Sequence, residues 1–156
     1  MTTDEPMTTD EPMTTDEPTR VAFVCVQNAG RSQMAYAFAR RERNERSLAS
    51  DVELLTGGTR PADAVHAEVV EAMRDVGIDI STRTPRAVTV EELQHSDYVV
   101  TMGCAADDVC PAGWGGESHD WDLEDPDGRP PDEVAEIRDT IERRVAALFD
   151  ELADRV

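Results

Sequence analysis

The chain has 156 residues, enough for one domain of ordinary size, and hydrophobic residues make up 39% of it. Aromatic residues are only 4%, so aliphatic side chains must fill most of the core. Asp and Glu number 34 against 15 basic residues, all of them arginine, which gives a formal net charge of −19. This charge argues against nucleic acid and anionic membranes as partners, because both are bound through Lys and Arg on phosphates.

The acidic composition also indicates where the protein works. An acidic coat without lysine is typical of a high-salt cytoplasm, where salt screens the repulsion between carboxylates, although a GC-rich genome can also encode an acidic protein. The longest apolar run, residues 21–26, is far shorter than the roughly 20 residues that span a bilayer. The acidic N-terminus is unlike a signal peptide, and three cysteines are too few for a disulfide scaffold. We therefore expect a halophilic, cytoplasmic protein.

Residues 1–18 are three copies of the hexamer Met-Thr-Thr-Asp-Glu-Pro. The unit has no apolar face to bury, so residues 1–19 are predicted to form a disordered acidic tail. Each copy begins with a possible start, Met1, Met7 or Met13, and a tandem duplication around the start codon explains the repeat more simply than a solvating function. Residues 20–156 are then expected to form the single folded domain.

The first half of this domain alternates strands and helices. Residues 21–25 are fully apolar, which is typical of a buried parallel strand, and a helix is predicted from Ser32 to about Ser47. A second strand is expected over residues 52–55, closed by Gly57 and Gly58. The next helix is predicted to open at Pro61, to bury Val65, Val69, Ala72, Met73 and Val76, and to stop at Gly77.

The second half continues the alternation. Thr89 and Glu92 predict a capping box for a short helix, residues 98–102 a third strand, and residues 118–123 a weak fourth one. The last helix has the clearest apolar stripe, formed by Val134, Ile137, Ile141, Val145, Leu148 and Leu152. We therefore expect an α/β fold with three layers, α/β/α, around a four-stranded parallel sheet. Ligands of such sheets bind at the carboxyl ends of strands, where Cys25 and Cys104 are predicted to lie.

The loop between the first strand and the first helix carries the chemistry. Cys25 is followed by Val26, Gln27, Asn28, Ala29 and Gly30, and then by Arg31 and Ser32. Five residues in this position can curl their N–H groups around an oxyanion at a helix N-terminus, with positive φ expected at Asn28 and Gly30. Arg31 offers a planar fork for two oxygens, and Ser32 can donate a hydrogen bond to a Cys25 thiolate. A lone cysteine is more often a buried hydrophobe, but the complete pattern favours a nucleophile.

The chain resembles the low-molecular-weight tyrosine phosphatase superfamily, and more closely the arsenate reductases built on that fold. The similarity is carried by three runs, Asn28 to Ala35, Thr101 to Cys104 and Trp121 to Pro126, and it covers residues 20–156. The resemblance implies a low-molecular-weight phosphatase-like catalytic domain that binds arsenate or phosphate. It implies no metal and no other cofactor.

The reaction needs a carboxylic acid to protonate the departing oxygen. On composition alone this acid could be any of Asp120, Asp122, Glu124, Asp125 or Asp127. Only the resemblance, which places an Asp directly before Pro, selects Asp125 as the general acid.

The two remaining cysteines separate reductase from phosphatase. In the reductases that the chain resembles, a second cysteine attacks the sulfur that bears arsenic, and a third takes over the disulfide. This implies that Cys104 releases arsenite from Cys25, that Cys110 resolves to a Cys104–Cys110 disulfide, and that thioredoxin or a low-molecular-weight thiol reduces it. A helix would separate these two Cα atoms by about 9 Å, whereas a disulfide needs about 7 Å, so the segment must be or become a loop.

Alternatives to the arsenate reductase remain open at this point. A phosphatase acting on phosphotyrosine or small phosphate esters would use the same loop, although Asp127-Gly128-Arg129 offers no aromatic platform for a substrate ring. A non-catalytic oxyanion-binding module would not need Cys25, Arg31 and Asp125 together. Cys104, Cys110 and His119 are too few and too unevenly spaced for structural zinc. His66, His95 and His119 show no paired spacing and are expected to be surface or partly packed residues. Arg60, Arg83 and Arg86 could rim an anion site, although surface charge is the expectation for each.

Overall fold

The computed structural model describes residues 18–103 and 114–155. Four strands form one parallel sheet in the order β2-β1-β3-β4, and they are β1 (Thr19–Cys25), β2 (Val52–Gly58), β3 (Tyr98–Met102) and β4 (Glu117–Asp120). The four-stranded parallel sheet is thus confirmed, and β3 has the predicted bounds. The second strand is longer than predicted, because Gly57 and Gly58 pair with Val24 and Cys25 instead of ending it. The fourth strand ends at Asp120, short of the predicted Leu123.

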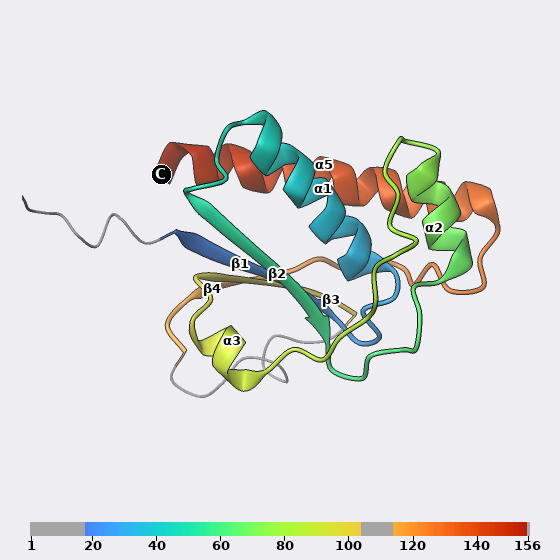
Figure 1. The fold of residues 1–156 in the computed structure, drawn as a ribbon, viewed down its shortest axis with the longest axis horizontal. Coiled ribbons are helices and arrows are strands. Elements are labelled where there is room, and N and C mark those ends of the chain that lie inside the picture. The colour runs from blue at the N-terminus through green and yellow to red at the C-terminus, as the bar shows by residue number, and fades with distance from the viewer. Residues whose placement is uncertain (1–17, 104–113, 156) are drawn as a thin grey trace, which may run out of the picture.

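Four helices are described, and they cover both faces of the sheet. They are α1 (Arg31–Glu45), α2 (Ala67–Arg74), α3 (Val90–Gln94) and α5 (Pro131–Arg155). Figure 1 shows α1, α2 and α5 over one face, with α3 on the other. Alternate side chains of β1 divide accordingly, since Val21 and Phe23 belong to the core under α1 and α5, whereas Ala22 and Val24 pack with Leu93 of α3. The three-layer α/β/α architecture is confirmed.

The apolar stripe of the last helix is buried along its whole length. All six stripe residues lie in the core, where α5 packs against α1 and α2: Val134, Ile137, Ile141, Val145, Leu148 and Leu152. The short helix α3 has the predicted capping box, in which Thr89 accepts from the Glu92 N–H and Glu92 accepts from the Thr89 N–H. Both predictions rest on local sequence patterns, and both are confirmed.

The predicted start of the second helix at Pro61 is wrong. The helix α2 begins at Ala67, and Val65 and Val76 both lie outside it. The backbone N–H groups of Thr59, Arg60, Ala62 and His66 instead donate to carbonyl groups of residues 25–29, so this segment is held against that part of the chain and does not form a helix. The predicted stop is correct, because Gly77 has a φ of +83° and the N–H groups of Gly77 and Ile78 close the helix on Arg74 and Met73.

Within residues 18–103 and 114–155, no helix is both long enough and apolar enough to cross a membrane. The hexamer repeat up to residue 17 lies outside the described residues, and so do Cys104 and Cys110.

Candidate active site

The residues that follow β1 form a tight loop, residues 26–30, which we name the oxyanion loop. Cys25 ends the central strand β1 and is buried at the carboxyl edge of the sheet, directly below the N-terminus of α1. Asn28 has a φ of 53°, the left-handed conformation that the curl was predicted to need. Gly30 does not, since its φ is −140°. A glycine is favoured there for another reason, because a Cβ would lie 2.9 Å from Cγ of Pro126 and one of the two residues would have to shift.

The carbonyl groups of Val26, Gln27, Asn28 and Ala29 accept hydrogen bonds from residues outside this loop. Three of these bonds come from backbone N–H groups: Arg60 to Val26 (2.8 Å), Ala62 to Gln27 (2.9 Å) and His66 to Ala29 (3.0 Å). The carbonyl of Cys25, which precedes the loop, accepts from the Thr59 N–H at 3.2 Å. The carbonyl of Asn28 accepts from the Gln33 amide. In a trans peptide the N–H points opposite to the C=O, so the N–H groups of the loop face inward. The Asn28 N–H does so directly, 3.2 Å from Sγ of Cys25.

The thiol of Cys25 is surrounded by hydrogen-bond donors. Oγ of Ser32 lies 2.8 Å from its sulfur. A thiolate can only accept, so with Cys25 ionised the Ser32 hydroxyl is the donor. Nδ2 of Asn28 donates to that hydroxyl at 2.7 Å and to Oγ1 of Thr56 at 2.9 Å. These donors and the N-terminus of α1 stabilise negative charge on the sulfur.

A buried polar network holds the loop from behind. The amide of Gln33 donates to both oxygens of Asn28, and the Arg83 Nε donates to Oε1 of Gln33 at 2.9 Å. The backbone N–H of Arg86 reaches Oδ1 of Asn28, and its guanidinium binds the Thr56 carbonyl. Arg83 and Arg86 are therefore structural supports of the loop, beyond the surface charges that the sequence predicted. Arg60 contributes its backbone N–H only, as described above.

Arg31 connects the oxyanion loop to the segment before α5, residues 121–130, which we name the acid loop. Its side chain is only 12% exposed, and one guanidinium nitrogen donates to the Leu123 carbonyl at 2.9 Å. The other lies 3.9 Å from Oδ2 of Asp125. The guanidinium also passes over Gly103, where a Cβ would lie 2.6 Å from Nη2. Arg31 is thus fixed between the end of β3 and the acid loop.

These groups enclose a cavity of about 260 Å³, which we name the Cys25 cavity. It is lined by Cys25, Val26, Gln27, Gly30, Arg31, His66, Gly103 and Asp125. Of the five carboxylates that the sequence left open, Asp125 is the one that lines it. Asp120 does not line the cavity, and its carboxylate accepts a hydrogen bond from the Thr101 hydroxyl. His66 is the residue that sequence reasoning missed, because neither its spacing nor its neighbours in the chain mark it.

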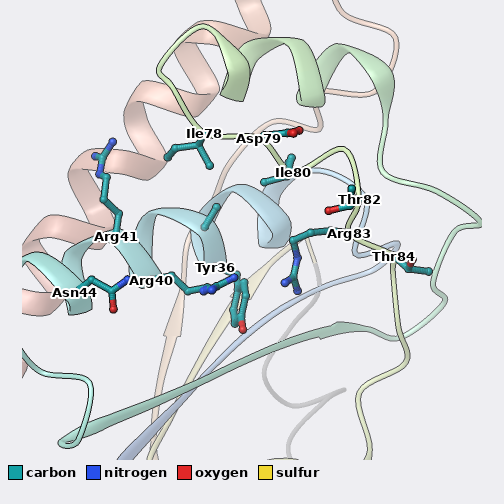
Figure 2. A pocket seen from close by; sticks show the side chains of 11 residues that line it. Tyr36, Arg40, Arg41, Asn44, Ile78, Asp79, Ile80, Thr82, Arg83 and Thr84 are labelled. Carbon is teal, nitrogen blue, oxygen red and sulfur yellow. The ribbon is translucent and has the colours of Figure 1, made fainter.

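A larger cavity of about 600 Å³ lies between α1 and residues 78–84 and shares no lining residue with the first. Figure 2 shows Arg40 and Arg83 directed toward Tyr36, whereas Arg41 points the other way. The two guanidinium carbons lie 5.9 and 4.4 Å from the Tyr36 ring centre, and Arg41 is paired with Glu142. The three arginines of this larger cavity therefore already have partners within the protein. The cavity is linked to the oxyanion loop through the hydrogen bonds from Arg83 to Gln33 and from Gln33 to Asn28.

The described residues contain one group with metal-ligand chemistry, formed by His66, Glu68 and Asp127. Oε2 of Glu68 accepts from the Gly128 N–H, and the His66 ring contacts Gln27, so both are already engaged by the protein. His119, the third residue weighed for zinc, pairs with Glu117 at 2.8 Å. The two cysteines weighed with it lie outside the described residues.

The approach of β2 to the oxyanion loop gives a first prediction. A Cβ on Gly58 would lie 2.5 Å from the Val26 carbonyl oxygen and 3.0 Å from the Asn28 nitrogen, and both contacts are backbone. Gly58→Ala is therefore expected to destabilise the protein by about 1–3 kcal/mol and to weaken the activity at Cys25 by about 10²-fold. Urea unfolding and steady-state kinetics measure the two effects. Gly115→Ala, where a Cβ meets open space, is the control, and equal behaviour of the two variants would refute the prediction.

The strand β1, the oxyanion loop and the helix α1 surround a buried thiol, an arrangement that suits attack on a tetrahedral oxyanion in an α/β enzyme. The family of low molecular weight phosphotyrosine protein phosphatases matches residues 20–156, so the chain belongs to this family. A relative from Halobacterium salinarum, named "Putative arsenate reductase", is 55% identical over 138 residues, which cover 85% of this chain and 92% of the relative. The acidic, lysine-free composition of this chain is consistent with a relative from a halophile.

Solved structures of this family and fold resemble the chain as well. The thioredoxin-dependent arsenate reductase of Corynebacterium glutamicum superimposes with a TM-score of 0.73 at 35% identity, over 89% of this chain and 64% of that longer one. An arsenate reductase in a phosphate-binding state gives a TM-score of 0.70 at 28% identity, over 85% and 98% of the two chains. A phosphotyrosine phosphatase from Vibrio cholerae, over 88% and 98%, has a TM-score of 0.77 but only 20% identity, and so shares the fold alone.

Proposed function

We propose that this protein is an arsenate reductase. The observation that carries the proposal is the Cys25 cavity, in which a buried thiol, a fixed guanidinium and a carboxyl group meet around inward-facing N–H groups. A site of this kind attacks a tetrahedral oxyanion. The relatives at 55% and 35% identity, both named as arsenate reductases, support arsenate as that oxyanion.

In the first step, the N–H groups of the oxyanion loop and the Arg31 guanidinium hold three oxygens of arsenate. The Cys25 thiolate attacks arsenic, an S–As bond forms, and one As–O bond breaks. Asp125 supplies the proton with which that oxygen leaves as water. Asp125 suits this role because it lines the Cys25 cavity, is 55% exposed there, and lies 3.9 Å from the Arg31 guanidinium. The Ser32 hydroxyl, 2.8 Å from the sulfur, donates a hydrogen bond to the attacking thiolate.

In the second step, the Cys104 thiolate attacks the Cys25 sulfur. The electron pair of the S–As bond passes to arsenic, arsenite leaves, and a Cys25–Cys104 disulfide remains. Cys110 then attacks Cys104, which frees Cys25 and leaves a Cys104–Cys110 disulfide. Thioredoxin or a low-molecular-weight thiol supplies the two electrons that reduce it. Gly103 supports this order, because it lines the Cys25 cavity and Cys104 is its neighbour in sequence.

A phosphatase is the second candidate, and the family itself favours it. In that reaction Cys25 would form a phosphocysteine that water hydrolyses, and the other two cysteines would take no part. The acid loop supports the reductase instead. Asp127, Gly128 and Arg129 follow Pro126, so this part of the loop has no aromatic side chain to stack on a phosphotyrosine ring.

Counting thiols in a single turnover tests the proposal. The reduced protein is freed of reductant in molar salt, mixed with arsenate, and titrated for thiols after denaturation. We expect three thiols to fall to one with the release of one arsenite. Cys110→Ser should fall from two to none, since Cys25 and Cys104 still pair, whereas Cys104→Ser should keep both of its thiols. Three remaining thiols together with hydrolysis of an aryl phosphate would establish the phosphatase instead.

A further inference from the structure

His66 lies directly before α2 and contacts both loops of the active site. Its backbone N–H donates to the Ala29 carbonyl, and its Nε2 lies 3.1 Å from Oε1 of Gln27, both in the oxyanion loop. Its Nδ1 lies 3.9 Å from Oδ1 of Asp127 in the acid loop. The side chain is only 18% exposed and lines the Cys25 cavity. The imidazole therefore bridges the loop that binds the oxyanion and the loop that carries the acid.

The protonation state of this ring matters to both contacts. With Oε1 of Gln27 as acceptor, Nε2 carries a hydrogen. In the neutral ring Nδ1 then presents a lone pair toward the Asp127 carboxylate, whereas in the imidazolium it presents an N–H. Only the imidazolium therefore has a donor on each side, and it also adds a positive charge to the wall of an anion-binding cavity.

Ionisable groups face His66 from the acid loop and from three elements, α1, α2 and β1. Asp125 and Asp127 belong to the acid loop, Arg31 to α1, Cys25 to β1 and Glu68 to α2. The pKa of Glu68 is lowered by hydrogen bonds from its own backbone N–H and from that of Gly128, with a further contribution from His66. Glu68 therefore stays ionised near neutrality and places a negative charge on the α2 side of the ring.

We propose that His66 is an anion-binding and positioning residue of the Cys25 cavity. Its protonated ring ties the oxyanion loop to the acid loop and strengthens the binding of a tetrahedral dianion. This inference rests on the oxyanion-binding part of the proposed function and does not require the reduction of arsenic. A lone imidazolium at the wall of a partly desolvated cavity is expected to change the affinity for a dianion by about three- to tenfold.

Sulfate binding tests this role, because sulfate keeps its charge across the pH range and cannot react. We would use the Cys25→Ser protein, which removes the thiol titration, and measure the sulfate dissociation constant by calorimetry from about pH 5.5 to about pH 8. The affinity is expected to fall by about three- to tenfold as the pH rises through the imidazole range. Adding His66→Gln, which keeps a donor for Gln27 without the charge, should make the profile flat.

The chain provides a matched control in His119, a partly exposed histidine with its own carboxylate partner, Glu117, outside the cavity. His119→Gln should leave the pH dependence unchanged, and Asp127→Asn should move its midpoint to lower pH. An unchanged slope in His66→Gln would overturn the proposal, and so would a flat profile in His119→Gln or no sulfate binding at any pH. Intact pH-dependent sulfate binding in a protein that fails the thiol count would instead refute only the reductase reaction.

Discussion

Replacing Arg31 by lysine is expected to lower kcat/KM for the oxyanion substrate by about 10²- to 10³-fold. The guanidinium performs two tasks at once, since it faces the cavity and donates to the Leu123 carbonyl of the acid loop. An ammonium has no planar fork, so it cannot bind two substrate oxygens in the same geometry while it holds the acid loop. Steady-state kinetics with arsenate, and with an aryl phosphate as a second substrate, measure the loss.

Arg144→Lys is the matched control for this variant, because Arg144 is an exposed arginine of α5 that does not line the Cys25 cavity. It should retain full activity. If Arg31→Lys loses less than about tenfold, the guanidinium does not act as a fork in the transition state. Such a small loss would mean that the N–H groups of the oxyanion loop make the main contribution to binding the substrate oxygens.

Asn28→Asp is expected to destabilise the fold by about 3 kcal/mol or more and to abolish attack by Cys25. Asn28 is fully buried, and its amide nitrogen donates to both Ser32 and Thr56. A carboxylate of the same shape loses both donors and places a negative charge beside the Cys25 sulfur. The positive φ is not the cause, because aspartate adopts that conformation as readily as asparagine.

Urea unfolding and single-turnover kinetics test this variant. Asn44→Asp is its control, because Asn44 is an exposed residue on α1, and its substitution should change the free energy of unfolding by less than about 0.5 kcal/mol. A stable, active Asn28→Asp protein would mean that the network behind the oxyanion loop is not needed to hold the thiolate.

Features that depend on short stretches of sequence were predictable. The stripe of α5, the capping box at Thr89 and the helix stop at Gly77 all follow from neighbours within a few residues, and all are present. The loop from Cys25 to Ser32 is also local, since its strand, curl and helix are contiguous. These patterns were sufficient to predict the sheet, the three layers and the position of the thiol.

Features that depend on distant partners were not predictable. Pro61 is a good helix start by composition, but the N–H groups around it bind the carbonyls of the oxyanion loop, more than 30 residues earlier. His66 and Arg83 carry no local signal either, and they gain their roles only through contacts with Gln27 and Gln33. Asp125 could be chosen from its acidic neighbours only by resemblance, because composition does not say which carboxylate reaches the cavity.

The backbone bonds that turn the carbonyls of the oxyanion loop outward have a consequence for selectivity. They make the loop rigid before any ligand arrives, and such a preformed cradle recognises four oxygens around a centre rather than the centre itself. Phosphate, which has the same shape and charge, is then expected to enter it as readily as arsenate. Discrimination must therefore come after binding and attack, at the step in which the electron pair of the bond to sulfur passes to the central atom and reduces it, which arsenic(V) allows and phosphorus(V) does not. Phosphate in the cell would act as a reversible competitor, and the rate of arsenic detoxification would depend on the ratio of the two anions.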